Sequence, residues 1–286
     1  IYELTNFDMN SKSNQINDII VVNNELFIEA NLANSIGVSL WQSEGVIDDE
    51  VLILDPSTYA SSSYGPMDFY SLGDITIFCG YSDNNQYSLW RTDGTDTGTF
   101  MISSHVTRHT FNYECISEGI EFGNELFFNA YSSLYGESLW KTDGTIEGTV
   151  MIKDTHTSST YYGPSYLTVF GNELFFSAGD ATNGQALWKS DGTTAGTVMV
   201  KDTHTSSTTF GPTYLTVFGS ELFFSAGDAT NGYALWKSDG TTAGTVMVKD
   251  THTSSSYYGP SYLTVFGNEL FFSAGDATNG YALWKS

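Results

Sequence analysis

Apolar and polar residues alternate in short runs along the whole chain, and turn-forming residues separate the runs. The clearest stretch reads SYLTVF at 165–170, ELFFSAG at 173–179, QALWKS at 185–190 and TVMVKDT at 197–203. Alternation with a period of two is typical of β-strands that bury one face. Gly171 and Asn172 both tolerate positive φ, so their two-residue link predicts a β-hairpin. The stretch therefore predicts four short antiparallel strands, and no part of the chain has helical periodicity.

This four-strand unit recurs along the chain, and a Leu-Trp pair marks the third predicted strand of each copy. The period is about 48 residues, and a fixed period of this size indicates one supersecondary unit whose copies stack on one another. Four antiparallel strands per unit are typical of a propeller blade. We therefore predict an all-β fold, a β-propeller of six four-stranded blades that forms a single domain over residues 1–286. The six tryptophans, which we interpret as inter-blade core, are Trp41, Trp90, Trp140, Trp188, Trp236 and Trp284.

The two ends of the sequence suggest how the predicted ring closes. The sixth unit reaches its third strand at ALWKS, and the segment IYELTNF at 1–7 aligns with the fourth-strand segment VMVKDTH. We expect this N-terminal strand to complete the last blade, which would remove an exposed sheet edge. The alternative is an open fragment of a longer array of the same repeat.

The chain is strongly acidic, with 33 aspartates and glutamates against 10 lysines and arginines and a formal net charge of −23. Nucleic acids and anionic membrane surfaces are therefore poor partners. No apolar run approaches the roughly 20 residues that a membrane-spanning helix needs, so we expect no membrane insertion. The acidity serves either solubility or the binding of cations. The two cysteines, Cys79 and Cys115, lack metal-ligand spacing and form either one disulfide or two half-buried thiols.

The third and fourth strands of most units are joined by a recurrent turn, as in ALWKSDGTTAGT at 186–197. With the preceding NELFFSAGDATNG, this segment resembles the ELWxxDGTxxGT repeat, a hyalin-like repeat widespread in secreted and surface proteins of bacteria. The match covers most of the chain, although the first unit departs from it as SLWQSEGVIDDEV. The resemblance implies an extracellular or cell-surface β-propeller and implies no particular reaction. We interpret the Asp-Gly-Thr turns as structural, because the aspartate accepts backbone N–H bonds and the glycine permits a tight turn.

One end of the predicted blades gathers the Asp-Ala-Thr-Asn-Gly turns and the long crossovers between units. Aromatic rings beside carboxylates and amides suit a sugar-binding surface, because rings stack on C–H groups while polar groups bond to hydroxyls. In the structural alternative, the tyrosines stiffen the crossovers and each aspartate caps its own turn. The candidate ligand-binding residues are Tyr161, Tyr162, Asp180, Asn183, Asp228, Asn231, Tyr257, Tyr258, Asp276 and Asn279.

The same turns carry the candidate calcium ligands Asp180, Asp228 and Asp276. Calcium takes about six to eight oxygens, so a neighbouring loop such as 153–155 would have to contribute. Calcium is the one cofactor that the sequence suggests.

No catalytic motif is present: the sequence lacks a Gly-x-Ser-x-Gly elbow, a phosphate loop and a His-Glu-x-x-His motif. Loops copied from unit to unit favour multivalent binding or assembly over a single catalytic centre. We therefore expect a non-enzymatic extracellular protein for adhesion or for surface or filament assembly, acting on surface glycans or proteins or on copies of itself. Self-association would follow if the strand at 1–7 completed the last blade of a neighbour. The alternatives are a lectin-like glycan-binding module and, less favoured, a propeller glycoside hydrolase.

Overall fold

A computed structural model of the protein describes residues 15–22, 25–31, 38–43, 51–54, 66–82, 86–107, 115–155, 163–180, 184–204, 211–228, 230, 232–251, 259–276 and 280–286. These residues form strands β1 to β23, and none of them lies in an α-helix. Within this part of the chain there is accordingly no helix long and apolar enough to cross a membrane.

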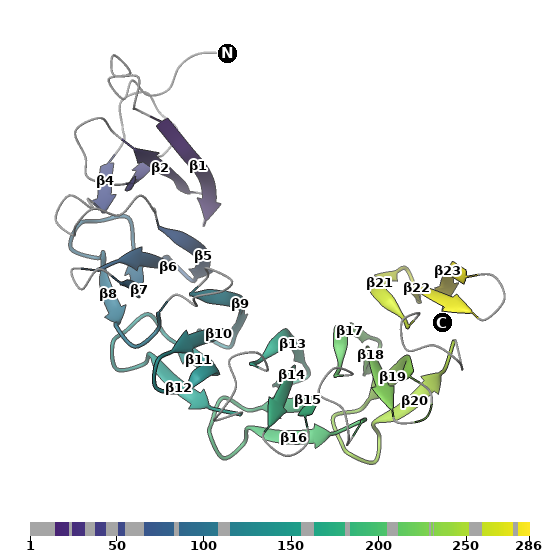
Figure 1. Cartoon of the computed structure of the whole chain (residues 1–286). Coiled ribbons are helices and arrows are strands. Elements are labelled where there is room, and N and C mark those ends of the chain that lie inside the picture. The colour runs from purple at the N-terminus through teal and green to yellow at the C-terminus, as the bar shows by residue number, and fades with distance from the viewer. Residues whose placement is uncertain are drawn as a thin grey trace, which may run out of the picture. The chain divides into compact units, whose positions relative to one another are not determined.

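The strands form six antiparallel sheets, in which each strand pairs with the next along the chain (Figure 1). The first sheet is β1 (Gln15–Val22), β2 (Glu25–Asn31), β3 (Val38–Ser43) and β4 (Val51–Leu54). The second is β5 (Met67–Leu72), β6 (Ile75–Tyr81), β7 (Tyr87–Thr92) and β8 (Phe100–Ser103). The third is β9 (Ile116–Phe122), β10 (Glu125–Ser132), β11 (Gly136–Thr142) and β12 (Val150–Lys153).

The last three sheets repeat the same plan with nearly the same sequence. The fourth sheet is β13 (Ser165–Phe170), β14 (Glu173–Asp180), β15 (Gly184–Ser190) and β16 (Val198–Lys201). The fifth is β17 (Thr213–Phe218), β18 (Glu221–Asp228), β19 (Gly232–Ser238) and β20 (Val246–Lys249). The sixth has three strands among the described residues: β21 (Ser261–Phe266), β22 (Glu269–Asp276) and β23 (Gly280–Lys285).

An up-and-down sheet of four short strands, repeated in tandem, is the blade of a β-propeller. The predicted fold class is therefore confirmed, as are the four strands that the alternation pattern placed in a unit, for the first five units. Gly171 has a φ of 63° at the first hairpin, as the Gly-Asn signal required. The segment 1–7, which we expected to complete the last blade, lies outside the described residues.

The chain separates into two compact units. Unit 1 comprises residues 1–126, 130–134 and 141–150, and unit 2 comprises residues 127–129, 135–140 and 151–286. The first two sheets thus belong to unit 1, and the last three belong to unit 2.

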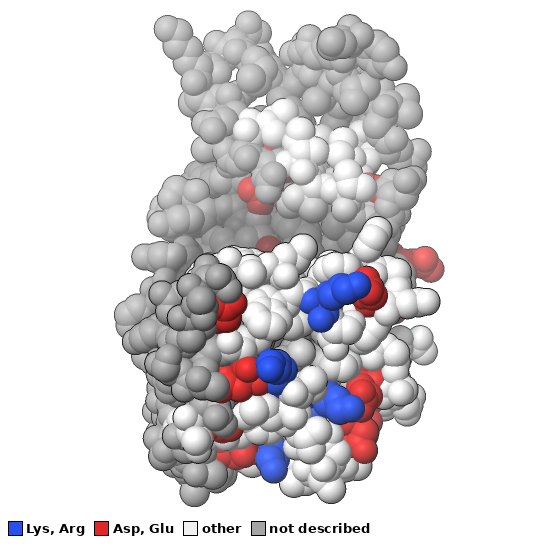
Figure 2. All heavy atoms as spheres, turned by 90° about the vertical axis from the view of Figure 1, so that its right-hand side faces the viewer, with Lys and Arg blue, Asp and Glu red and all other residues white. Residues whose placement is uncertain are grey.

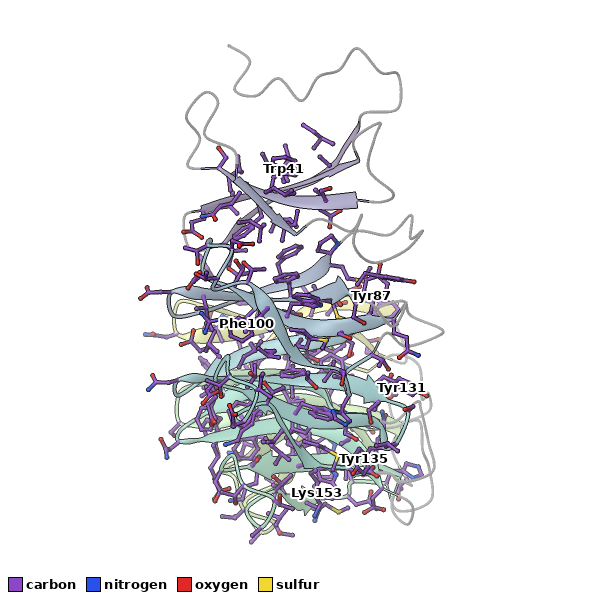
Figure 3. The ribbon with its side chains drawn as sticks, turned by 90° about the vertical axis from the view of Figure 1, so that its left-hand side faces the viewer. Trp41, Tyr87, Phe100, Tyr131, Tyr135 and Lys153 are labelled. Atoms are coloured by element: carbon purple, nitrogen blue, oxygen red, sulfur yellow. A yellow bond between two sulfur atoms is a disulfide. The ribbon has the colours of Figure 1, made fainter. Side chains whose placement is uncertain are left out.

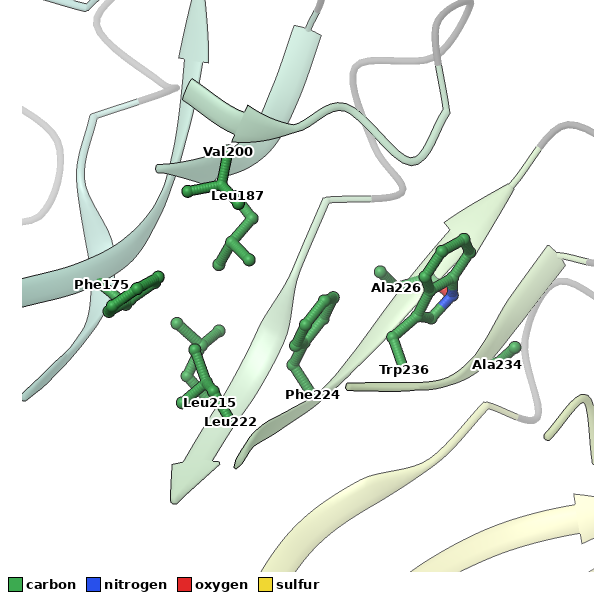
Figure 4. Close-up of a cluster of buried hydrophobic side chains, with 9 residues drawn as sticks. All are labelled: Phe175, Leu187, Val200, Leu215, Leu222, Phe224, Ala226, Ala234 and Trp236. Carbon is green, nitrogen blue, oxygen red and sulfur yellow. The ribbon is translucent and has the colours of Figure 1, made fainter. Parts of the chain in front are cut away.

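In unit 2, successive blades bury apolar side chains against each other (Figure 4). Phe175 and Leu187 of the fourth sheet share one cluster with Leu222 and Phe224 of the fifth. Trp236 belongs to the same cluster, and its indole N–H also donates to the carbonyl oxygen of Ala226 at 3.0 Å. The other members of the cluster are Val200, Leu215, Ala226 and Ala234. Tryptophan in the third strand therefore packs the core here, as the sequence predicted.

In unit 1, the first and second sheets share an equivalent cluster that includes Phe27, Leu40, Phe78 and Trp90. Figure 3 labels Trp41 on the first sheet of this unit. A disulfide between Cys79 in β6 and Cys115, just before β9, adds a covalent link in this unit. The two Cα atoms are 6.2 Å apart, which is within the usual range for a disulfide.

The Asp-Gly-Thr turns between third and fourth strands are closed by their own side chains. Asp191 Oδ1 accepts hydrogen bonds from the Thr193 backbone N–H at 2.9 Å and from the Thr193 hydroxyl at 2.7 Å. The Thr193 hydroxyl oxygen in turn accepts the Gly196 N–H at 2.9 Å. A Cβ atom added to Gly196 would collide with the Asp191 carboxylate, so this position requires glycine. The same bonds recur at the other three Asp-Gly-Thr turns, which supports the structural interpretation.

Candidate functional site

The three predicted calcium-binding aspartates lie at the ends of second strands. Asp180, Asp228 and Asp276 are the last residues of β14, β18 and β22, and all three are partly buried. Asp228 Oδ1 accepts the backbone N–H of Thr230 at 2.7 Å, which is the turn-capping role of the structural alternative. The other candidate ligand residues lie outside the described residues: Tyr161, Tyr162, Asn183, Asn231, Tyr257, Tyr258 and Asn279.

A further aspartate lies near Asp180 at the same end of the fourth sheet. Asp202 follows β16, and its Oδ1 accepts the backbone N–H of His204 at 2.9 Å. Burial raises the pKa of the Asp202 carboxyl, and the negative charge of Asp180 raises it further. In the described part of the chain, three metal-ligating side chains meet at one place, Asp68 with Cys79 and Cys115, but both sulfurs are used by the disulfide. Calcium binding by the Asp180 repeat therefore stays a prediction.

A cavity in unit 2 lies between the fourth, fifth and sixth blades and has a volume of about 600 Å³. Tyr166, Tyr214 and Tyr262 line it from β13, β17 and β21, the first strands of three successive blades. Their ring centroids are 5.9 Å apart for Tyr166 and Tyr214 and 5.6 Å apart for Tyr214 and Tyr262. We call these three residues the tyrosine ladder. The remaining lining residues are Thr213, Ser225, Tyr233, Gly259, Pro260, Ser261, Ser273 and Tyr281.

A repeated β-bulge positions the ladder. In β13 the pairing with β14 shifts register between Ser165 and Thr168, and Tyr166 lies in that interval with a φ of 57°. Tyr214 and Tyr262 have the same φ of 56° at the equivalent bulges. The backbone carbonyl of each tyrosine accepts the hydroxyl of the threonine two residues later at 3.0 Å. A bulky residue in the left-handed region is a genuine outlier, and such strain gathers at functional sites.

The second sheet shows what this bulge position does when it is not aromatic. Asp68 occupies it with a φ of 55°, and its Oδ2 accepts the backbone N–H groups of Cys115 at 2.8 Å and Ile116 at 3.1 Å. The residue equivalent to Ile116 is a proline in each of the last three units, for example Pro212. Because proline has no N–H, this double cap cannot form there. The residue at the bulge therefore has no such capping role in the blades that carry the tyrosine ladder.

The cavity is uncharged, and hydroxyl groups converge in it. None of its described lining residues is a lysine, arginine, aspartate or glutamate. Burial raises the pKa of the Tyr233 phenol, and the nearby Tyr166 phenol raises it further, so Tyr233 stays neutral and able to donate at pH 7. Tyr262 and Tyr281 are 73% and 59% exposed, so the cavity is accessible. Such a site can stack rings on an uncharged ligand and exchange hydrogen bonds with its hydroxyls.

Positive charge is scarce in these blades, and part of it is paired with glutamates of the same blade. Lys189 binds Glu173 at 3.1 Å, and the equivalent Lys237 binds Glu221 at 2.9 Å. Figure 2 shows blue side chains lying beside red ones over the described surface of this face, with no blue cluster. The described surface of this face therefore has no cluster of positive charge that would favour an anionic ligand.

Sequence reasoning emphasised the tyrosines of the crossovers and did not weigh the SYLTVF tyrosine as a ligand group. In a regular strand, Tyr166 would alternate with its neighbours and need no explanation. No glycine in β13 indicates the β-bulge that places Tyr166 at the cavity. The available signal was the repeat itself, since a tyrosine recurs at the same place in SYLTVF, TYLTVF and SYLTVF.

No protein-family model matches the chain, and no curated protein sequence is significantly similar to it. Among solved structures, oligopeptidase B from Leishmania major aligns with 96% of this chain and 39% of its own at 14% identity, with a TM-score of 0.54. A puromycin hydrolase aligns with 93% of this chain and 44% of its own at 13% identity, with a TM-score of 0.45. The β-propeller domain of the Trilobed protease from Pyrococcus furiosus aligns with 96% of this chain and 81% of its own at 11% identity, with a TM-score of 0.42.

These similarities concern the fold. The chain spans less than half the length of the puromycin hydrolase and the oligopeptidase that it matches. At 14% identity, the similarity to oligopeptidase B agrees with a propeller architecture and carries no reaction to this chain.

Proposed function

We propose that this chain is a non-enzymatic, extracellular adhesion propeller that binds uncharged carbohydrate in the cavity of the tyrosine ladder. The observation that supports it most is the set of three tyrosines in left-handed backbone conformation, whose rings follow one another along a 600 Å³ cavity. Left-handed conformation costs about 1–2 kcal/mol for each non-glycine residue, so three such residues imply a use for their side chains.

The chemistry of the lining favours carbohydrate among uncharged ligands. The rings offer faces to C–H groups, while Thr213, Ser225, Ser261 and Ser273 supply hydroxyls that both donate and accept. An extended peptide rich in proline would use the rings and leave most of these hydroxyls without partners, so carbohydrate fits the set better.

The test is a glycan array followed by calorimetry on the glycans that bind. We expect binding of neutral glycans, with the affinity reduced at least tenfold by Tyr214→Ala. Tyr135→Ala is the matched control, because Tyr135 is 42% exposed and is not among the residues that line the cavity. Binding only of proline-rich peptides, or binding that Tyr214→Ala leaves unchanged, would contradict the proposal.

Self-assembly is a second candidate function, supported by the exposed sixth sheet. Leu283 in β23 is 77% exposed, whereas the equivalent Leu235 in β19 is 1% exposed. Phe266 in β21 is 76% exposed. In the alignment of segment 1–7 with VMVKDTH at 198–204, Leu4 takes the place of Lys201, which pairs with Leu187 in the fourth sheet. This segment of a second molecule is therefore suited to pair with β23, where Leu283 is the equivalent of Leu187.

A mixing experiment tests this assembly. We expect the weight-average mass of the wild-type chain, measured by sedimentation equilibrium, to rise with concentration. The variants Leu4→Asp and Leu283→Asp should each be monomeric on their own. An equimolar mixture should form dimers and stop there, because only one intact edge meets one intact strand. A wild-type chain that stays monomeric at every concentration would exclude this route.

A further inference from the structure

The blades around the cavity repeat one set of ligand-facing groups. In the fifth blade, Thr213 pairs with Ser225 across β17 and β18, next to the ladder residue Tyr214. In the sixth blade, Ser261 pairs with Ser273 across β21 and β22, next to Tyr262. All six of these residues line the cavity. Each of the two blades therefore lines the cavity with one ring and two hydroxyl residues at equivalent positions. The hydroxyls of Thr213 and Ser261 donate to the carbonyl oxygens of Ser225 and Ser273 at 3.4 Å.

A second ring completes the set in these two blades. Tyr233 and Tyr281 stand at the same place in β19 and β23, and both line the cavity. A Cβ atom added to Gly259 would lie 2.2 Å from the Tyr233 Cβ, so the glycine of the next blade makes room for this tyrosine. In the fourth blade the equivalent residue is Gln185, which lies in the same way over Gly211. The fourth blade thus contributes its ladder ring, Tyr166, and lacks the second ring.

The ladder connects these sets without a break. Successive centroid distances of 5.9 and 5.6 Å bring neighbouring rings into contact across three blades, with adjacent ring planes tilted by 48° and 50°. A ligand that covers one ring meets the next ring at its edge.

We propose that the ligand is a linear, neutral polysaccharide made of one repeating sugar, which crosses the blades with one sugar unit per blade. This inference rests on the proposed carbohydrate function and specifies its ligand. Equivalent subsites at a regular repeat are all satisfied only by a ligand with the same repeat. A terminal branched sugar would use a single subsite and leave the others empty. The fifth and sixth blades form two full subsites, and the fourth blade forms a partial third one.

Calorimetry with a length series tests the proposal. The probes are homo-oligomers of glucose, xylose and mannose, each from one to six units long. For the sugar that binds, the association constant should rise with each added unit up to three units and then level off. Equal affinity for one unit and six units would overturn the polymer inference and leave carbohydrate binding intact. If no glycan on the array and no oligomer binds, the proposed function itself fails.

A gain-of-function variant gives an independent test. Gln185→Tyr should supply the missing second ring of the fourth blade, because Gly211 leaves the same room that Gly259 leaves for Tyr233. We expect about a fivefold rise in affinity for oligomers of three or more units, and no change for two units. Gln185→Leu is the matched control that adds apolar volume without a ring, and it should not reproduce the gain.

A loss-of-function variant covers the case in which Gln185→Tyr does not fold. Tyr166→Ala should weaken oligomers of three or more units by at least fivefold and leave the affinity for two units within twofold. Equal weakening at every length would show that Tyr166 supports the cavity as a whole and would overturn the subsite assignment.

Discussion

At the residue scale, the ladder tyrosines show that a strained backbone conformation can be retained because of the side chain that it positions. Tyr262 has a φ of 56° and is 73% exposed, so its side chain contributes little burial to offset the strain. Asparagine tolerates the left-handed region far better than an aromatic residue does. A residue chosen for stability alone would therefore differ from the one found here.

Tyr262→Asn should accordingly make the protein more stable while weakening glycan binding. We expect a gain of about 1 kcal/mol in the free energy of unfolding, from relief of the left-handed strain. Denaturant titration measures the gain and calorimetry measures the binding. Tyr281→Asn is the control: it removes a cavity ring at a residue without positive φ, so it should weaken binding with no gain in stability. A loss of stability in Tyr262→Asn would refute the strain argument.

The aspartates of the Asp-Gly-Thr turns predict a second effect, on the pH dependence of stability. The hydroxyl of Thr145 donates to Asp143 Oδ1 at 2.7 Å, and this bond is the main reason that the pKa of Asp143 is lowered. The pKa values of Asp93, Asp191 and Asp239 are lowered by equivalent threonines. A carboxyl with a lowered folded pKa stabilises the protein above its unfolded pKa, and this contribution is lost as the pH falls through the folded value.

We therefore expect stability to fall as the pH drops below about 3.9, the ordinary aspartate pKa. Thr145→Val should lower the free energy of unfolding at pH 7 by about 1 kcal/mol, since the Asp143 and Gly148 bonds are lost. It should also raise the pKa of Asp143 toward its ordinary value. Denaturant titrations across pH and an NMR titration of Asp143 measure the two effects. An unchanged Asp143 pKa in the variant would show that the hydroxyl bond is not its cause.

At the scale of elements, the strands were predictable from the sequence, whereas the β-bulge at Tyr166 was not. Gly171 and the alternation of SYLTVF and ELFFSAG define their hairpin by local chemistry alone, which is why that hairpin was predictable. The shift of register at Tyr166 depends on pairing with β14 and on the neighbouring blade, and no residue within β13 encodes it. The cavity arises only when three blades meet, so the tyrosine that recurs in SYLTVF and TYLTVF did not by itself show that these residues line one site.

The disulfide is the element-scale feature that can be tested most directly. Cys79 and Cys115 are separated by 36 residues, and closing a loop of that length is expected to stabilise unit 1 by about 3–4 kcal/mol. The double variant Cys79→Ser, Cys115→Ser should lose that amount in thermal or denaturant unfolding. A reductant should have the same effect on the wild-type chain and none on the double variant. If reduction leaves the unfolding of the wild type unchanged, the disulfide adds no stability in solution.

At the scale of the whole molecule, the formal net charge of −23 acts against the compact state. Repulsion among exposed carboxylates is long-range and is screened within about 10 Å at 0.1 M salt. The Lys–Glu pairs within the blades offset only a small part of it, because exposed pairs contribute little.

The melting temperature should therefore rise between 10 mM and 200 mM sodium chloride. Calcium chloride at equal ionic strength should give a similar rise if screening is the whole cause. A larger rise with calcium, abolished by Asp180→Asn with Asp228→Asn, would support the predicted calcium sites. Differential scanning calorimetry at fixed pH makes the comparison, and magnesium chloride serves as the control. A melting temperature that falls with sodium chloride would contradict the repulsion argument.

A glycine in each of three blades leaves space for a side chain of the preceding blade, and this packing has an evolutionary consequence. Glu137 lies over Gly163, Gln185 over Gly211 and Tyr233 over Gly259, so the same socket holds an acid, an amide or a ring. A point mutation at this position alters the chemistry of one blade while its scaffold stays intact. Duplication of that repeat in the gene then copies the whole altered blade. If the protein binds polysaccharide as proposed, the number of such blades would determine how many consecutive sugar units it binds.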